Sequence, residues 1–489
     1  MAVTDAVLAL DLSSSGVRAR AHSRALTVVA ERSVDITTRV GADGASSHDL
    51  GAIMAAVREV VRPLAADPEL RVVALVASGT ASSLAVARFG DGVPEPLSEV
   101  LLWSDSRAMS HYPDLAGDLA AAYGRTLCPP DASYWPAKLR YLADRDGLAS
   151  GVVAGAKDLV FGWLTGLLWT DPMSAASTGM FDSAAWRWDG ALLDRTGITA
   201  GRLPELHEAV ESAPLIPAVA DDLGLPAGLP VTLGGMDGPL SQLGAASTRE
   251  RTASCTIGTS IAVRAGSARR CADPARRIWC YPVARDFWVT GGAGSNGGNL
   301  LTWLRDKIGL AATIGQLADL AFSVPSDPNL TFVPYLHGER APLWRPDLRA
   351  AFIGLGPHHS SADMTRAVLD GLAASVLELA GAVESVAGAP ERVVFTGGFF
   401  RDARWMQLMT DALGVPAAVP VPEEATSVGA AMLAWAAGQD LPVAEVFTPG
   451  LEPVADPDPR VHESLRAAAA RLAGLRRVLW PLSSAGTGP

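Results

Sequence analysis

The sequence predicts an α/β protein built from two related halves, with a nucleotide-binding cleft between them. An apolar run breaks into a turn of small residues at 13–16, and the same design returns at 258–260. Around each turn, segments typical of a hairpin, a helix and a strand follow in the same order. The length of 489 residues also exceeds that of one typical domain. We therefore expect one domain of residues 1–245 and another of residues 246–489.

Composition and charge narrow the class of protein. Hydrophobic residues make up 49% and charged residues 19%, a balance typical of a well-packed chain and not of a largely disordered one. The net charge of -12 would repel nucleic acid and anionic membrane surfaces, so we expect neither as a partner and favour a small molecule. The four cysteines form no C-x-x-C pair, and the N-terminus lacks a basic segment followed by a long apolar stretch. These features predict a cytoplasmic protein.

The first half is expected to alternate strands and helices. Residues 7–31 are typical of a hairpin or short meander that is interrupted at the first turn. Apolar residues such as Ile53, Met54 and Val57 recur at helical spacing and predict a helix over 50–64, before a buried strand at 72–76. Later elements of this half are expected as helices near 137–142 and 159–167 and as a short strand at 231–233 that ends at two glycines.

The second half begins again with strands. The stretch 252–289 is rich in strand-forming residues, and a further strand is expected at 393–395. Helical periodicity predicts helices over 300–310, 364–386 and 405–413, with a closing helix over 464–477 and a frayed tail at 483–489.

The two turns are candidates for phosphate binding. Gly, Ser and Thr let backbone N–H groups and hydroxyls approach phosphate oxygens, because no bulky side chain stands between them. Asp11 ends the strand before the first turn and has the chemistry to hold a hydrated Mg²⁺. Taken singly, each turn also fits an ordinary tight hairpin, since Ser and Gly favour turns whatever the function.

Asp237 is the candidate catalytic base. It follows a strand and two glycines, and a helix is expected at 239–244 directly after it. A carboxylate at the mouth of a cleft can accept the proton of a substrate hydroxyl as that hydroxyl attacks a phosphoryl group. The alternative is an acidic residue that the helix dipole favours in a first helical turn.

Two further segments are candidate binding sites, one for the adenine ring of a nucleotide and one for a polyol substrate. Gly397 and Gly398 end a strand, so a flat adenine ring could approach the backbone there, although a plain strand-to-helix connection also fits. Asp105 and Arg107 supply an acceptor and a forked donor that suit a polyol, or are merely solvated. Trp103 and Trp344 could pack against a sugar or belong to the core.

In order along the chain, these segments resemble the FGGY family of carbohydrate kinases. The family pairs a phosphate turn with W-x-D-x-R, G-G-x-D, G-T-S, G-E-R-x-P and late G-G segments, and all six occur between Asp11 and about Ala434. The resemblance implies an α/β fold of two ribonuclease-H-like, actin-like ATPase domains with an ATP cleft. Residues 1–245 would carry the sugar site and the base, and residues 246–489 would bind ATP.

The resemblance also implies roles for single residues and the cofactors ATP and Mg²⁺. It makes Asp237 the catalytic base and a substrate ligand, and Asp11 the metal ligand. The implied nucleotide-binding residues are Ser14, Ser15, Arg18, Gly258, Thr259, Ser260, Gly298, Gly397, Gly398 and Asp402. The other implied substrate ligands are Ser82, Asp105 and Arg107.

Within the family, the segments at 288–306 and 338–344 are most similar to those of gluconate kinases, and xylulose kinases share parts of the late glycine segment. Three departures bear on specificity. Ser13 stands where the family usually has glycine, the stretch 77–84 lacks the usual Met-His pair, and Gly238 and Pro239 replace the usual Asn or Gln. The last two lie near the sugar in the family, so the substrate could differ.

We therefore predict ATP-dependent phosphorylation of a primary hydroxyl of a sugar or sugar acid, with gluconate favoured. The alternatives are a kinase of xylulose, another pentulose or a polyol, and a non-catalytic sugar or nucleotide sensor on a degenerate kinase scaffold. An actin-like or chaperone-like ATPase is a third alternative, and the polyol segments argue against it. A homodimer is possible, but no residue indicates one. The adjacent His358 and His359 are expected in a solvent-exposed turn.

Overall fold

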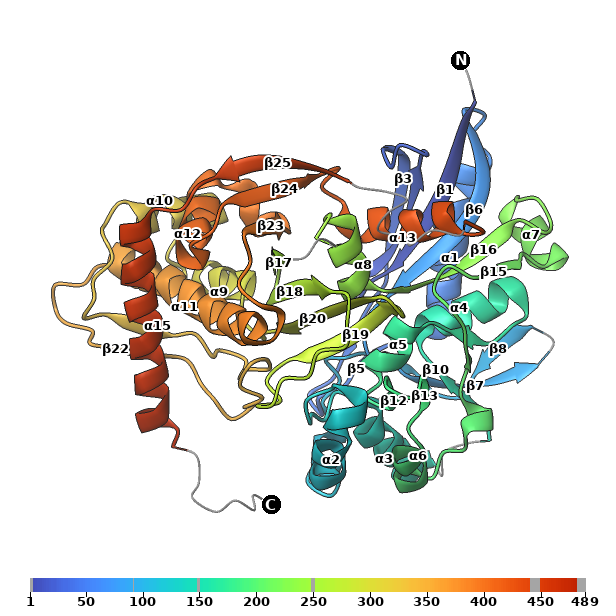
Figure 1. Ribbon diagram of the computed structural model, residues 1–489, viewed down its shortest axis with the longest axis horizontal. Coiled ribbons are helices and arrows are strands. Elements are labelled where there is room, and N and C mark those ends of the chain that lie inside the picture. The colour runs from blue at the N-terminus through green and yellow to red at the C-terminus, as the bar shows by residue number, and fades with distance from the viewer. Residues whose placement is uncertain (1–2, 91, 147–149, 248–250, 440–448, 482–489) are drawn as a thin grey trace.

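The computed structural model describes residues 3–90, 92–146, 150–247, 251–439 and 449–481. Two large mixed sheets dominate these residues, one in each half of the chain, so the α/β class with two halves is confirmed. Figure 1 shows the first half on the right and the second half on the left. Among the described residues, no helix is both long enough and apolar enough to cross a membrane.

The first sheet has six strands in the order β15-β16-β6-β1-β2-β3. β2 runs antiparallel to β1, whereas β1, β6 and β16 run parallel to one another, so their carboxyl ends share one edge. The strands are β1 (Thr4–Leu12), β2 (Gly16–His22), β3 (Val28–Asp35), β6 (Leu70–Gly79), β15 (Ser212–Pro214) and β16 (Pro230–Met236).

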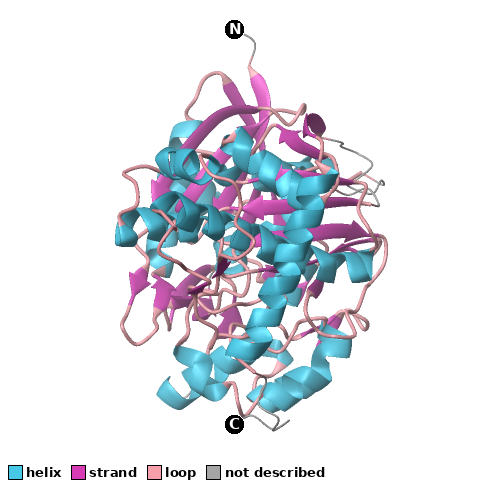
Figure 2. Ribbon diagram, turned by 90° about the vertical axis from the view of Figure 1, so that its left-hand side faces the viewer, coloured by secondary structure: helices cyan, strands magenta, loops and turns pink. Residues whose placement is uncertain are grey.

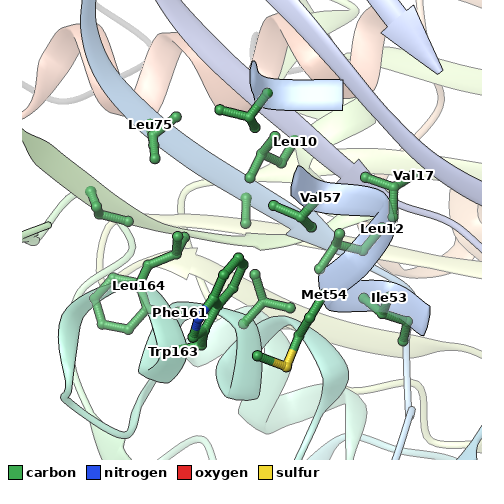
Figure 3. Close-up of a cluster of buried hydrophobic side chains, with 14 of the residues drawn as sticks. Leu10, Leu12, Val17, Ile53, Met54, Val57, Leu75, Phe161, Trp163 and Leu164 are labelled. Carbon is green, nitrogen blue, oxygen red and sulfur yellow. The ribbon is translucent and has the colours of Figure 1, made fainter. Parts of the chain in front are cut away.

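Helices α1 (Leu50–Ala65) and α4 (Ala156–Thr165) cover one face of this sheet. The predicted helix over 50–64 is confirmed, and the Asp49 carboxylate caps it by accepting the N–H of Ala52. Figure 3 shows Leu10 and Leu12 of β1 beside Val57 of α1, with Phe161 of α4 in the same buried cluster. Burial of such side chains is the main stabilising force of the layer.

Smaller elements complete the first half. They are the strands β4 (Arg39–Val40), β5 (Ser46–His48), β7 (Ala85–Gly90), β8 (Val93–Pro96), β9 (Val100–Leu101), β10 (Val152–Ala154), β11 (Trp169–Thr170), β12 (Phe181–Asp182), β13 (Arg187–Trp188) and β14 (Glu205–Leu206). The helices are η1 (Arg107–His111), α2 (Ala116–Thr126), α3 (Trp135–Asp146), α5 (Pro172–Ser177), α6 (Gly190–Thr196), η2 (Ala200–Arg202), α7 (Pro217–Leu223) and α8 (Asp237–Gly244).

The second sheet has seven strands in the order β19-β20-β18-β17-β23-β24-β25. These are β17 (Thr252–Ile257), β18 (Ile261–Ser267), β19 (Trp279–Ala284), β20 (Phe287–Ala293), β23 (Arg392–Thr396), β24 (Ala417–Val421) and β25 (Gly450–Ala455). The other elements are α9 (Gly298–Trp303), η3 (Leu304–Ile308), α10 (Ile314–Phe322), β21 (Thr331–Val333), β22 (Ala351–Ile353), α11 (Ser361–Ala387), η4 (Gly398–Arg401), α12 (Ala403–Leu413) and α15 (Pro459–Leu479). Figure 2 shows α15 running the length of the outer face of this half.

Helix α13 (Ala425–Ala436) belongs to the second half in sequence but packs on the first sheet. Its apolar side chains share a core with Val7 and Ala9 of β1 and with Leu240 of α8. Figure 1 shows α13 beside α8, across the first sheet. Helix α13 therefore packs one sequence half against the other. A domain boundary at residue 245 stays a prediction.

Two local expectations need correction, and a third is not tested by the described residues. The strand at 231–233 does not end at the two glycines but runs through them to Met236, with an irregular register because Gly234 adopts a positive φ of 71° against the backbone of Ala77. The helix over 300–310 changes to π-helical turns after Trp303 and ends at Ile308. The tail at 483–489 lies outside the described residues.

The histidine pair is exposed only in part. His358 is exposed, but the side chain of His359 is only 2% exposed. Nδ1 of His359 accepts the N–H of Gly356, and Nε2 lies 3.0 Å from the Asp327 carboxylate. His359 therefore helps to fix the loop before α11.

Candidate active site

The carboxyl ends of β1, β6 and β16 bring three polar side chains together. Asp11 of β1 pairs with Ser78 of β6, and Ser78 pairs with Gly235 of β16, two residues before Asp237. The Ser78 hydroxyl donates a hydrogen bond of 3.0 Å to the Asp11 carboxylate. Ligand sites in α/β sheets lie at such strand ends.

Asp237 is a partly buried carboxyl group at the first position of α8. Its Oδ1 accepts the N–H of Gly238 at 2.7 Å. Burial and the nearby Asp11 carboxylate raise the pKa of Asp237 to about 6, and the positive charge of Arg264 opposes this rise. Burial also raises the pKa of Asp11. A raised carboxyl pKa suits a group that accepts a proton near neutral pH.

Arg264 belongs to this site, although the sequence analysis gave it no role. It lies on β18 of the second half, where Nη1 donates to the Thr256 hydroxyl at 3.1 Å. Its Nε is buried without a hydrogen-bond partner among the described residues. The sequence did offer a signal for Arg264, which is the one charged residue in the apolar run 261–265. Alternate residues of a strand face opposite sides, so such a charge lies on one face of the sheet, where it can act on a site.

The first turn is organised by the hydroxyl of Ser13. Oγ of Ser13 accepts the N–H of Gly16 at 3.2 Å and donates to the Gly16 carbonyl at 2.9 Å. Gly16 has no space for a side chain, because a Cβ would lie 2.3 Å from the Val34 carbonyl oxygen. Ser14, Ser15 and Arg18 are exposed around this turn. The departure from glycine at position 13 therefore still gives a closed turn.

The second turn supports the start of helix α9. Gly258 and Thr259 are exposed at its tip, whereas Ser260 is partly buried. The N–H of Gly298 donates to the Gly258 carbonyl at 2.8 Å, and a Cβ at Gly298 would lie 2.6 Å from that oxygen. The glycine at position 298 thus lets the helix approach the turn closely.

The late glycines lie beside the second turn, because β17 and β23 run parallel with Thr256 opposite Thr396. Gly397 has a positive φ of 97°, and a Cβ at Gly398 would meet open space within the described part of the chain. A cavity of about 680 Å³ is lined by residues of both halves, including Arg18, Gly397 and Gly398.

A second cavity of about 520 Å³ adjoins Gly398 and includes Asp402. The Asp402 carboxylate caps α12 by accepting the N–H of Arg404 at 2.9 Å, and it also forms an ion pair with the Arg404 guanidinium. The two adjoining cavities are lined by four of the predicted nucleotide-binding residues, which are Arg18, Gly397, Gly398 and Asp402.

The predicted substrate residues of the first half are engaged with other protein groups. Asp105 and Arg107 form an ion pair of 2.6 Å with each other, and the Asp105 carboxylate also accepts the N–H of Ser46 at 3.0 Å. Both side chains are almost fully buried. The buried hydroxyl of Ser82 donates to the Ser177 carbonyl. The polar groups of these three side chains are therefore held by the protein itself in this structure.

Comparison with known proteins decides the family. Residues 6–244 match the N-terminal domain of the FGGY family of carbohydrate kinases, and residues 253–438 match its C-terminal domain. This chain belongs to the FGGY family. It is therefore a carbohydrate kinase of a family that uses ATP, and it has the two-domain, actin-like fold of that family.

Individual relatives of this FGGY kinase include enzymes for two substrates. A gluconokinase from Bacillus subtilis (strain 168) is 30% identical over 456 residues, which cover 88% of this chain and 87% of the relative. A ligand-bound xylulose kinase from Lactobacillus acidophilus has a TM-score of 0.92 and 26% identity, over 98% of this chain and 99% of that one. A gluconate kinase from Lactobacillus acidophilus has a TM-score of 0.91 and 25% identity, over 97% and 98%.

Proposed function

We propose that this kinase transfers the γ-phosphoryl group of ATP to a primary hydroxyl of a sugar acid, with gluconate as the favoured acceptor. The observation that carries the proposal is the pair of neighbouring carboxyl groups at the strand ends. Asp237 has a pKa of about 6 and lies close enough to Asp11 for their charges to interact. The similarity to gluconokinases supports the choice of acceptor.

Asp237 is the general base in this proposal. The acceptor oxygen forms a bond to the γ-phosphorus, the bond to the bridging oxygen of ADP breaks, and the hydroxyl proton passes to the Asp237 carboxylate. A positioned base of this kind contributes roughly 10² to 10⁴ in rate. The positive charge of Arg264 limits the rise of the Asp237 pKa, so that the carboxylate form is available at neutral pH.

Asp11 is the proposed Mg²⁺ ligand. The residues fit the ion, because Asp11 is a carboxylate beside a second carboxylate. Among the described residues, its only hydrogen-bond partner is the hydroxyl of Ser78. Mg²⁺ is usually held by one or two carboxylates and keeps several waters. When bound, it supplies positive charge beside the nucleotide phosphates.

The remaining nucleotide contacts follow from the turns and cavities. Ser14, Ser15 and the exposed tip at Gly258 and Thr259 offer backbone N–H groups and hydroxyls to phosphates. The cavities along Arg18, Gly398 and Asp402 are the proposed space for the rest of the nucleotide. We place the activity in the cytoplasm, where ATP is supplied, and a homodimer stays a prediction.

Two other functions remain as defined alternatives. Phosphorylation of xylulose is supported by the similarity to a xylulose kinase over 98% of this chain. A sensor without catalysis is favoured only by the departures at 77–84 and at Gly238.

The test measures ATP consumption with Mg²⁺ against gluconate, xylulose, glycerol and glucitol. We expect turnover with gluconate that Asp237→Asn lowers at least 100-fold, on the order of the contribution of a general base. Glu59→Gln, which removes an exposed carboxylate of α1, is the matched control and is expected to keep full activity. Turnover of xylulose alone would establish the first alternative. ATP binding without turnover of any acceptor would establish the sensor.

A further inference from the structure

Two of the four cysteines lie together at the start of β19. Cys271 belongs to the loop 268–278 between β18 and β19, and Cys280 is the second residue of β19. Both are free thiols and belong to one apolar cluster. The N–H of Cys271 donates to Sγ of Cys280 at 3.4 Å. Since the N–Cα bond is short, this contact places Cα of Cys271 within about 5 Å of that sulfur. Such a distance is compatible with a disulfide, whose Cα atoms lie about 4.4–6.8 Å apart.

The two thiols differ in their access to solvent. Cys271 is half-buried, and its Sγ donates to the Arg269 carbonyl at 3.3 Å. Cys280 is only 1% exposed, and burial raises the pKa of its thiol to about 12. An oxidant in solution therefore reacts with Cys271, and Cys280 can react only afterwards, with the sulfur of Cys271.

The loop that carries Cys271 is rich in positive charge. Arg269 and Arg276 are exposed, and Arg270 and Arg277 are half-buried. The Asp273 carboxylate forms an ion pair of 2.9 Å with Arg277. Four arginines against one aspartate within a few residues attract small anions to this surface. The charge therefore favours an oxidant that is itself an anion.

The same loop contacts the first half of the chain. The Arg270 guanidinium donates to the carbonyl of Arg125 in α2 at 3.0 Å and to the hydroxyl of Ser183 at 2.9 Å. The N–H of Cys280 donates to the carbonyl of Leu127, which directly follows α2, at 3.2 Å. One cysteine is next to Arg270 in sequence, and the other makes a contact to the first half itself. A bond between the two sulfurs would therefore act on the contact between the halves.

We propose that Cys271 and Cys280 form a redox modification site, which a small anionic disulfide oxidises and which slows the kinase by stiffening the contact between its halves. The inference goes beyond the proposed function. Disulfides that form in a reducing compartment are usually transient and regulatory, so this pair would report oxidising conditions.

The oxidation proceeds by two exchange steps. The thiolate of Cys271 attacks one sulfur of the small disulfide, whose S–S bond breaks and releases one small thiolate. The thiolate of Cys280 then attacks the Cys271 sulfur and displaces the second small thiolate. The protein loses two electrons, the small disulfide gains them, and the protons of the two protein thiols end on the two released thiols. The second step is slow, because little of the Cys280 thiol is ionised near neutral pH.

The bridge acts on turnover through the loop. It closes a ring that begins directly after Arg270 and ends in β19, so the backbone that holds α2 loses freedom. Relative motions of domains admit substrates and release products, and they limit kcat in many enzymes. A stiffer contact between the halves is therefore expected to lower kcat and to leave ATP affinity nearly unchanged.

The test incubates the full-length kinase with glutathione disulfide and measures intact mass, a peptide map, melting temperature and kcat. We expect a Cys271–Cys280 bridge that forms over minutes to hours, the timescale of uncatalysed exchange. The oxidised protein should melt at a higher temperature, because the bridge restricts the unfolded chain. Its kcat should fall several-fold, and dithiothreitol should restore both values.

Single-cysteine variants separate the two steps. Cys280→Ala should stop at a mixed disulfide, with one glutathione bound to Cys271 and no bridge. Cys271→Ser should take up no glutathione and keep its kcat under oxidation. Cys128→Ala removes a buried thiol whose Sγ donates to the Ala176 carbonyl at 3.2 Å, and it is the control that should still form the bridge.

The outcomes distinguish this inference from the proposed function. A wild type that forms no bridge, or pairs Cys271 with Cys128 instead, overturns the inference. A bridge that leaves kcat unchanged also overturns it, and the proposed function stands in each of these cases. If the kinase phosphorylates no acceptor, the proposed function fails, whereas the mass, the peptide map and the melting temperature still decide whether the site is oxidised as described.

Discussion

Gly244 of α8 and Gly429 of α13 lie backbone against backbone where the two helices cross. A Cβ at Gly244 would lie 1.9 Å from the Ala425 carbonyl oxygen, and a Cβ at Gly429 would lie 2.0 Å from that of Leu240. Each glycine therefore makes space for the other helix. Because α8 begins with Asp237, this crossing also sets the position of the proposed base.

We expect Gly429→Ala to lower both stability and turnover. The added methyl group forces the helices apart, and overpacking of this kind costs about 1–3 kcal/mol. The displacement of α8 moves Asp237, so kcat should fall more than ATP affinity. Gly474→Ala in α15 is the control, since its Cβ would meet open space within the described residues and should stabilise the helix by about 0.5–1 kcal/mol. Equal melting temperatures of the two variants would contradict the prediction.

We expect Asp237→Asn to stabilise the metal-free protein above about pH 6. The folded protein raises the pKa of this carboxyl group from 3.8 to about 6, so between these values the folded state binds more protons than the unfolded state. Stability therefore falls as the pH rises through this window, and a shift of this size corresponds to about 3 kcal/mol.

The measurement is the melting temperature in buffer with a chelator. The variant should melt higher than the wild type at about pH 7.5, and the difference should shrink toward pH 4. A difference that does not depend on pH would show that the carboxylate charge is not its cause.

We expect Arg264→Met to move the acid limb of the kcat/KM profile to higher pH. Arg264 is the positive charge that lowers the pKa of Asp237, so its removal lets that pKa rise further. A rise of about one pH unit corresponds to about 1.4 kcal/mol of lost interaction. Arg264→Lys keeps the charge and should keep the profile of the wild type. A profile that shifts equally in both variants would point to a change of shape instead of charge.

We expect Lys157→Met to destabilise the first half strongly. The ammonium group of Lys157 is buried and lies 2.9 Å from the Asp158 carboxylate and 3.0 Å from that of Asp171. Its removal leaves two buried carboxylates unpaired, at a cost of about 3–5 kcal/mol. Arg88→Met removes one partner of an exposed pair with Glu95, and it should cost less than about 1 kcal/mol. Similar melting temperatures for the two variants would contradict this assignment.

The sequence alone predicts the elements whose signals are local. The apolar spacing around Val57 predicts a helix over 50–64, and the structure has it over Leu50–Ala65. The first turn is likewise local, because Ser13 closes it by contacts within three residues. Such elements need no knowledge of the rest of the chain.

Packing contacts between segments that are far apart in the sequence could not be predicted in this way. Helix α13 is apolar on nearly all sides, so its sequence does not indicate which sheet it covers. The requirement for glycine at 244 and 429 appears only when the two helices meet. Arg264 acts on the charge of Asp237, and Arg340 contacts the ring of Trp103. In each pair the two residues come from different halves of the chain, so neither contact can be predicted from local sequence. The roles of the individual site residues stay predictions until the variants are measured.

During synthesis on a ribosome, the last strand of the first sheet is complete at Met236, but the helix that covers one of its faces begins only at Ala425. Val7, Ala9 and Val76 on that face lack this cover while most of the second half is made. A nascent chain that ends before α13 therefore exposes an apolar surface of the kind that chaperones bind, and a separate fragment of the first half would leave the same surface uncovered.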